Sequence, residues 1–327
     1  MDKREFIKRT MVGAIALGAS TKVSSAISDF TDIPINKTNK RALGKTGFDV
    51  FPVVYGGIIS MRDGQEASNN YVAWARDRGV NYFDVAPTYG DAQEKLGLSI
   101  KPFRQEIYLA AKTTQRIKED AEKEFEESLR LLHTDYLDVF QLHSLTTEDD
   151  VNKAFGPNGV IEMIQNEKKR GRIRKVGFSA HSQTQALCAM SMYDFDTVMF
   201  PLNWQMDMRD GWGSGVANDA KKRGVGVIAI KGLTHRSWIE GDNRNQYPKS
   251  WCKPIDVSEV ELGVAALKYT FRAGADVIIP PGDFRNFAFC VDHIDEILDD
   301  VSSPSHTALL RKEYDAVKDY PFFEPKT

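Results

Sequence analysis

The sequence predicts a single (β/α)8 barrel. Short apolar, β-branched runs alternate with amphipathic segments from about residue 42 onward, and eight such units fit into roughly 250 residues. The runs are apolar almost throughout, which is typical of parallel strands that helices cover on the outside. No GxGxxG motif opens the first unit, and its absence from that place weighs against a Rossmann domain.

Each strand is predicted from a run that ends at a turn or at the start of a helix. The eight runs are 49–57, 81–87, 107–114, 136–143, 173–181, 196–204, 226–233 and 276–282. The clearest helices are 65–79, 91–101, 118–133, 159–170 and 258–272. In the third of these, Phe125, Leu129 and Leu132 recur at helical spacing.

Composition narrows the function classes. The 327 residues carry a formal net charge of -3 with both signs interspersed, which gives no electrostatic footprint for nucleic acid. The basic stretch 167–175 is interpreted as the solvated end of a helix. Three widely spaced cysteines (Cys188, Cys252, Cys290) predict neither a disulfide framework nor a metal site. No segment is apolar over enough residues to predict a transmembrane helix.

The N-terminus is typical of an export signal. A basic stretch is followed by a short apolar run and then by small residues at 24–26. Lys3, Arg4, Phe6, Ile7 and Lys8 form a pattern that resembles a twin-arginine signal with lysine in place of the first arginine. We therefore expect a signal over 1–26 and a periplasmic or exported protein, with a cytoplasmic protein as the alternative.

The predicted domain organisation follows from this N-terminus and from the barrel pattern. We expect a linker over 27–40, the barrel over 41–300, and a C-terminal helix and tail over 301–327 that pack on the barrel.

Polar residues stand where the predicted strands end. The second run reaches Asp84, with Tyr89 just beyond it, the third contains Lys112, and the fourth ends at His143. Each residue alone has an ordinary explanation, such as a helix cap or a lysine that extends to water. Because active sites of (β/α)8 barrels lie at the C-terminal ends of the strands, the four together predict one site.

The chain resembles the aldo-keto reductase family from Arg41 to about residue 300. The resemblance rests on LGKTGFDVFPVVYGG, FDVAPTYG, the lysine of AAKT, the histidine of QLHS, and GRIRKVGFSAH. It implies a (β/α)8 oxidoreductase that uses NADPH or NADH to interconvert a carbonyl and an alcohol. It also implies that Asp84, Tyr89, Lys112 and His143 form the catalytic tetrad, and that the protein is a monomer.

The chemistry of these side chains agrees with that role. Hydride addition to a carbonyl leaves an alkoxide, which needs a proton from a placed acid, here Tyr89. A phenol is a weak acid, so we expect the Lys112 ammonium to lower the pKa of Tyr89, and Asp84 to hold Lys112. His143 would donate a hydrogen bond to the substrate oxygen.

The resemblance also implies the cofactor contacts. They are Gly57, Ile58, Ser179, Asn203, Lys231, Gly232, Leu233, Pro281, Gly282 and Arg285. Three positions depart from the family pattern, with Ala180 in place of asparagine, Met199 in place of glutamine, and Ile230 in place of a ring-stacking tyrosine. Asp283 beside a single arginine favours free ribose hydroxyls, and hence NADH or use of both cofactors, over a 2′-phosphate.

The connection 234–257 is long enough to predict a functional loop. Trp238, Tyr247 and Trp251 are predicted to form an apolar wall for the substrate, for example an oxidised sugar or glycoside; alternatively, they attach the loop to the barrel. Two further classes stay open. One is a catalytically silent nicotinamide-binding regulator, and the other is a barrel lyase or isomerase that uses Lys112 or His143 as a base.

Overall fold

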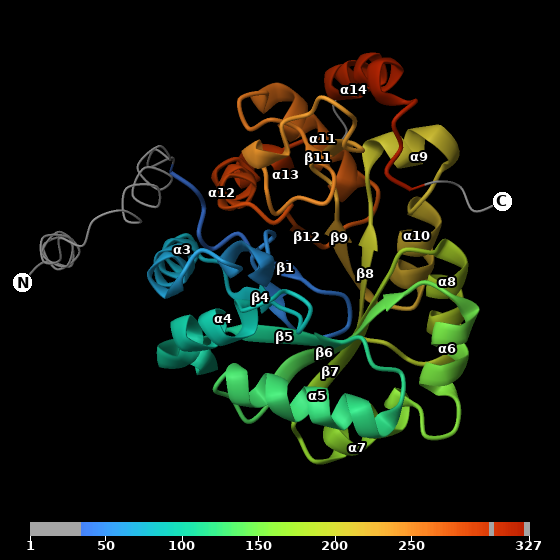
Figure 1. The fold of residues 1–327 in the computed structure, drawn as a ribbon. Helices are drawn as coiled ribbons and strands as arrows, with labels where there is room; N and C mark the ends of the chain where they lie inside the picture. Colours follow the sequence, from blue (N-terminus) through green and yellow to red (C-terminus); the bar gives the residue numbers. More distant parts are fainter. Residues whose placement is uncertain (1–33, 301–303, 324–327) are drawn as a thin grey trace, which may run out of the picture. The chain divides into compact units, whose positions relative to one another are not determined.

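A computed structural model describes residues 34–300 and 304–323 and contains the predicted barrel (Figure 1). Eight parallel strands lie in the order β12-β9-β8-β7-β6-β5-β4-β3. They are β3 (Tyr55–Gly56), β4 (Tyr82–Asp84), β5 (Tyr108–Thr113), β6 (Leu137–Leu145), β7 (Ile173–Ala180), β8 (Thr197–Pro201), β9 (Gly226–Ile230) and β12 (Val277–Ile279). A parallel bridge between Val53 and Ile278 joins the first and last strands, so the sheet closes on itself.

Helices surround the strands, as Figure 1 shows. They are α3 (Gln65–Asp77), α4 (Ala92–Ile100), α5 (Lys118–Leu131), α6 (Glu148–Phe155), α7 (Val160–Lys169), α8 (Gln183–Met192), α9 (Trp204–Asp210), α10 (Ser214–Lys222), α11 (Val260–Arg272), α12 (Phe284–Asp292), α13 (Ile294–Leu298) and α14 (Pro304–Val317). The last of them, α14, packs on α11 and α9. No helix in the described ranges combines the length and the apolar character that a membrane crossing requires.

The predicted first strand, 49–57, is wrong in its continuity. Asp49–Val50 forms β2, which pairs antiparallel with β1 (Arg41–Ala42), and the barrel strand β3 begins only at Tyr55. Pro52 interrupts the run because proline has no N–H to donate to a ladder. The hairpin places Leu43 and Val50 against Val139 and Ile228, so it fills the end of the barrel opposite the predicted site.

Two short helical segments follow β6 and β3 that the sequence pattern did not predict. Helix α6 begins with a capping box, in which the Thr147 side chain and Asp150 satisfy each other's backbone N–H groups. A 3-10 turn, η1 (Gly57–Ser60), follows β3 directly. The predicted export signal, 1–26, lies outside the described residues.

The long connection after β9 is partly ordered by a hairpin of its own. Strands β10 (Thr234–Arg236) and β11 (Lys253–Pro254) pair antiparallel, and a short 3-10 turn, η3 (Arg244–Gln246), lies between them. Backbone pairing therefore fixes the base of the loop, and its tip lies over the C-terminal ends of the strands.

Candidate active site

Three neighbouring strands deliver the four predicted catalytic side chains. Strand β4 ends at Asp84, and β5 places Lys112 opposite Gln141 of β6, two residues before His143. Tyr89 lies in the turn after β4, where its N–H donates to the carbonyl of Ala86 at 3.1 Å. The parallel register thus brings residues 59 positions apart in sequence to one end of the barrel.

A buried ion pair forms the base of the site. The ammonium of Lys112, which is fully buried, donates to Asp84 Oδ1. The second carboxylate oxygen accepts a hydrogen bond from Gln141 Nε2 at 2.7 Å. Burial raises the pKa of Asp84, and Lys112 and Gln141 oppose that rise by stabilising the carboxylate.

The Lys112 ammonium remains protonated in this environment. Burial alone would lower its pKa, but Asp84 and Tyr89 together raise the pKa above the usual lysine value. Its Nζ lies 5.1 Å from the centre of the Tyr89 ring. A fixed positive charge therefore sits directly beside the phenol.

The expected direction of the Tyr89 pKa is wrong. Burial raises the pKa of Tyr89 above its usual value, and the Lys112 charge, which lowers the pKa as predicted, does not outweigh burial. Sequence reasoning considered the lysine without the desolvation of the phenol. Tyr89 therefore carries its proton at neutral pH, and the Lys112 ammonium, which stabilises the phenolate, offsets part of the cost that burial adds to donating that proton.

His143 is a neutral imidazole. Burial, followed by the charges of Lys112 and Arg116 and the nearby His181, lowers the pKa of His143 to about 3. Its ring lies edge-on to the Tyr89 ring, with 6.0 Å between centroids. At neutral pH it can therefore donate one N–H hydrogen bond without carrying a charge.

Two residues that support this site were not predicted. Arg116 Nη2 donates to the carbonyl of His143 at 2.7 Å and is held by an ion pair with Asp150. Gln141 lies on the same face of β6 as His143, because side chains alternate along a strand. That period of two could have identified Gln141, whereas no local pattern identifies Arg116.

The predicted cofactor residues of β3 and β12 lie side by side. Gly57 and Ile58 begin η1, and a methyl group on Gly282 would clash with the Ile58 side chain and come 3.0 Å from the Lys249 carbonyl. Lys249 also donates from Nζ to the carbonyl of Ile59 at 2.7 Å. The loop after β9 therefore reaches across to this edge, a contact that the sequence did not predict.

Arg285 is already engaged within the protein. Its guanidinium donates to Asp283 Oδ1 at 3.0 Å and to the carbonyl of Gln246, and it stacks on the ring of Tyr247 at 4.6 Å. Pro281 precedes this group, and its carbonyl accepts from the Asp283 N–H at 2.7 Å. Asp283 takes up the charge of Arg285 and caps the start of α12.

The predicted cofactor contacts after β7 and β8 differ in whether they have a hydrogen-bonding group left for a ligand. The hydroxyl of Ser179 accepts from the Ser144 N–H at 2.8 Å and retains its own hydrogen for donation. Asn203 uses both amide hydrogens, on the carbonyls of Lys231 at 2.9 Å and Thr234 at 2.8 Å, while its oxygen caps α9. The Asn203 amide thus stabilises the backbone from Lys231 to Thr234 and has no N–H left for a ligand.

Lys231, Gly232 and Leu233 follow β9 directly. Lys231 adopts a left-handed backbone conformation, with φ of 65°. Leu233 is buried, and a methyl group on Gly232 would lie 2.7 Å from the Thr270 hydroxyl. Of the three, Lys231 carries a charged side chain, and its Nζ lies 5.5 Å from the centre of the Phe323 ring.

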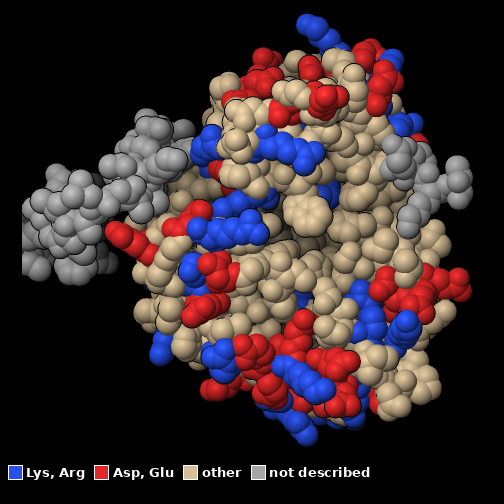
Figure 2. Space-filling view, viewed as in Figure 1, with Lys and Arg blue, Asp and Glu red and all other residues tan. Residues whose placement is uncertain are grey.

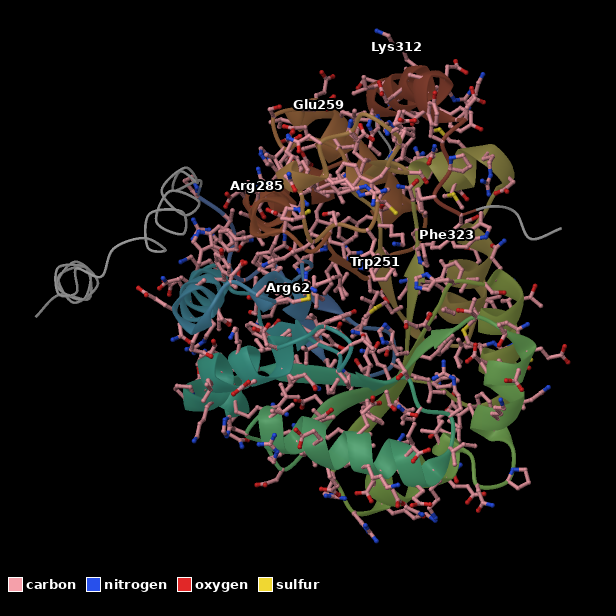
Figure 3. The ribbon with its side chains drawn as sticks, viewed as in Figure 1. Arg62, Trp251, Glu259, Arg285, Lys312 and Phe323 are labelled. Carbon is pink, nitrogen blue, oxygen red and sulfur yellow. The ribbon has the colours of Figure 1, made fainter. Side chains whose placement is uncertain are left out.

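The three aromatic residues predicted as a substrate wall separate into two groups. Trp238 donates from Nε1 to the carbonyl of Ser250 at 3.0 Å, and the hydroxyl of the buried Tyr247 donates to Asp256 at 3.1 Å, so both hold the loop together. Trp251 is 85% exposed and lies on this face between the labelled Arg62 and Phe323 (Figure 3). Only Trp251 keeps an aromatic surface that a ligand could cover.

The face that carries these residues is hollowed near its middle. Figure 2 shows the hollow bordered mainly by uncharged residues, with several Lys and Arg side chains to one side. A separate cavity of about 280 Å³, lined by residues 101–106 and 133–136, lies where β5 and β6 begin. That cavity is at the opposite end of the barrel from the tetrad and has no part in its chemistry.

The neutral histidines predict acid sensitivity. The pKa values of His143 and His181 are about 3 and about 4 in the folded protein, against an ordinary 6.5, so only the unfolded chain binds these protons just below pH 6.5. Stability from this source is complete above pH 6.5 and falls with decreasing pH, by about 2 kcal/mol for each histidine at pH 5. Denaturant unfolding between pH 7 and 5 measures it.

A matched pair of variants isolates the effect. His181→Gln should flatten the fall in stability with pH, and His133→Asn, a change at an exposed histidine, should leave the slope as in the parent protein. An unchanged slope in His181→Gln would show that His181 titrates normally in the folded state.

Comparison with known proteins finds a family whose sequence model matches this chain. The sequence model of the Aldo/keto reductase family matches residues 59–272. An uncharacterised oxidoreductase of Bacillus subtilis, YqkF, is 30% identical over 155 residues, which cover 43% of this chain and 48% of that protein. The L-galactose dehydrogenase of Arabidopsis thaliana is 28% identical over 163 residues, covering 44% and 49%. The chain thus aligns with about half the length of these curated relatives.

A solved structure agrees in fold across nearly the whole barrel. The glycerol dehydrogenase of Gluconobacter oxydans superposes with a TM-score of 0.63 at 18% identity, covering 90% of this chain and 99% of that one. At this identity the likeness concerns the fold.

Proposed function

This chain belongs to the aldo/keto reductase family, and on that premise we propose that it reduces an aldehyde, ketone or keto-sugar with NADPH or NADH, or catalyses the reverse oxidation. The observation that carries the proposal is the buried Asp84–Lys112 ion pair with Tyr89 directly beside it. A barrel that only bound nicotinamide would not need a protonated phenol next to a buried ammonium. A lyase or isomerase using Lys112 as a base would need the lysine neutral, whereas the pKa of Lys112 is raised.

In the reduction, the side chains act on the carbonyl oxygen. His143 donates its N–H to that oxygen and orients the substrate, and Tyr89 donates its proton as negative charge develops. Lys112 then stabilises the phenolate that remains, and Asp84 keeps Lys112 charged. In the oxidation, the same phenolate would accept the proton of the alcohol.

A nicotinamide cofactor, when bound, supplies or accepts the hydride. The residues present fit such a group in part. The hydrogen of the Ser179 hydroxyl would donate to a carboxamide. Gly57 and Gly282 pack so closely on Val85 and Ile58 that no side chain would fit at either position. Pro281 and the Gly232–Leu233 backbone would contact the bound cofactor, and Asn203 would support it indirectly through its hydrogen bond to the Lys231 carbonyl.

The charged residues at the start of α12 bear on whether the protein uses NADH or NADPH. Arg285 is neutralised by Asp283 and bound to the Gln246 carbonyl, so it is not a free cation for a 2′-phosphate. We therefore favour NADH, or use of both cofactors. Dissociation constants for NADH and NADPH, measured by fluorescence titration, test this preference directly.

For the substrate, we propose a sugar derivative or a related polyol. The exposed ring of Trp251 offers a flat apolar face of the kind that packs on sugar rings. One of the relatives is named as an L-galactose dehydrogenase, which acts on a sugar. We also propose that residues 1–26 direct export, that 27–40 link them to the barrel, and that the protein is a monomer; N-terminal sequencing from the source cell tests the first.

The experiment for the proposed reaction is a screen of cofactor oxidation. Purified protein is mixed with NADH or NADPH and with aldehydes, ketones and keto-sugars, and the loss of nicotinamide absorbance is followed. Turnover with at least one carbonyl is expected. Cofactor binding is measured by fluorescence in the same preparation. If neither NADH nor NADPH binds, the proposal that this chain is an oxidoreductase is wrong.

A further inference from the structure

Three side chains from separate parts of the chain gather beside the tetrad. His181 follows β7 and Lys231 follows β9. Phe323, which is labelled in Figure 3, comes from the C-terminal tail. The Phe323 ring lies 5.3 Å from the His181 ring, and Lys231 Nζ lies 5.5 Å from the centre of the Phe323 ring. We name this group the tail cluster.

The tail cluster is held in place from behind. Trp212 stacks on Phe323 with 5.3 Å between centroids, and Arg209 Nη1 donates to the Phe323 carbonyl at 2.9 Å. The Lys231 backbone is fixed in its left-handed conformation by the Asn203 amide, which bonds its carbonyl at 2.9 Å. A non-glycine residue in this conformation is strained, and such strain is concentrated at functional sites.

Its charges are not balanced within the described ranges of the chain. Lys231 forms no ion pair there, and its Nζ contacts only Cys252 Sγ, at 4.0 Å, apart from the Phe323 ring. The Nδ1 atom of His181 is buried and has no hydrogen-bond partner among the described residues. A half-buried cation and an unpaired imidazole nitrogen together are complementary to an anionic oxygen group.

The tail cluster lies next to the predicted catalytic residues. Strands β6 and β7 are neighbours, and Leu145 pairs with Ala180, the residue before His181. His181 is close enough to His143 to contribute to the lowering of the His143 pKa. A ligand that reached Tyr89 and His143 with one end could therefore contact His181 and Lys231 with the other.

We propose that the tail cluster is a subsite for a carboxylate on the substrate, so that the preferred substrates are carbonyl acids such as sugar acids. This inference rests on the proposed function. Lys231 supplies the charge, His181 supplies a hydrogen bond, and the Phe323 ring covers the carbon chain between the carboxylate and the carbonyl. The Lys231 Nζ lies beside the Phe323 ring of the tail and the Sγ of Cys252, which favours the substrate over a cofactor phosphate as the source of the anion.

The test compares substrates that differ in a carboxylate. We would measure kcat/KM for D-glucuronate against D-glucose and for succinic semialdehyde against butanal. The parent protein should prefer each acid, and Lys231→Met should reduce the acid-to-neutral ratio by about 10- to 100-fold, the range of one charge-assisted hydrogen bond. Lys312→Met, a change at a distant exposed lysine of α14, should leave the ratio unchanged.

Two results would overturn the inference. The first is an equal rate for acids and neutral partners in the parent protein. The second is a weaker cofactor dissociation constant in Lys231→Met with an unchanged ratio, which would assign the lysine to a cofactor phosphate. If no carbonyl is reduced at all, the proposed function fails as well.

Discussion

Tyr89→Phe should lose nearly all turnover while it binds the nicotinamide cofactor almost as well as the parent protein does. The change removes one hydroxyl and leaves the ring beside Lys112 and His143 in place. Without the hydroxyl, the alkoxide that hydride addition creates has no proton donor next to it. General acid catalysis contributes about 100- to 10,000-fold, so kcat should fall by at least that range.

The readout separates a lost proton donor from a damaged fold. Cofactor affinity by fluorescence and the denaturant midpoint should both remain close to the parent values. The loss should appear in kcat and kcat/KM together, because the missing interaction forms in the transition state. Full activity in Tyr89→Phe would refute the assignment of the proton donor, and His143 would then be the remaining candidate.

The architecture and the convergence of the tetrad could be predicted because both follow from periodicity and topology. Parallel strands place their C-terminal ends together, so Asp84, Lys112 and His143 at the ends of successive strands had to approach one another. The same logic failed at residues 49–57, where Pro52 divides an apolar run into a hairpin strand and a barrel strand. A pattern of apolar residues cannot show which partner each half chooses.

The electrostatics of the site could be predicted only in part. The residue types correctly indicated that Lys112 favours the phenolate of Tyr89, but the net pKa depends on how deeply the phenol is buried. Burial is a property of the whole packed barrel and is not visible in the sequence around Tyr89. Because burial makes the phenol a weaker acid, the Lys112 charge is needed to offset burial when Tyr89 donates its proton.

The loop contacts were beyond sequence reasoning for a different reason. Lys249 reaches Ile59, 190 positions away in the chain, and Phe323 reaches His181 from the C-terminal tail. Such contacts depend on how a long loop and a tail fold over the barrel, and no short-range spacing encodes them. Two of the three aromatic residues expected to meet substrate, Trp238 and Tyr247, instead stabilise the loop internally, because their polar atoms bond to other residues of the same loop.

Asp84→Asn should be the most destabilising conservative change at the site. It leaves the Lys112 ammonium fully buried without its counter-ion, and the asparagine amide cannot balance that charge. Removal of one partner from a buried ion pair costs about 3 to 5 kcal/mol. Urea or guanidinium unfolding measures the loss, and Glu119→Gln, which removes an exposed partner of Lys123, should show no measurable change.

The double variant Asp84→Asn/Lys112→Met distinguishes the cost of the unpaired charge from the value of the pair. Because a buried pair can be replaced by apolar atoms at little cost, the double variant should regain most of the stability that Asp84→Asn loses. It should regain no activity, since Tyr89 then has no cation to stabilise its phenolate. Equal instability of the single and double variants would mean that Asp84 contributes through its bond to Gln141 and not through Lys112. Recovery of stability without recovery of turnover would show that this ion pair is retained for catalysis, since the fold does not depend on it.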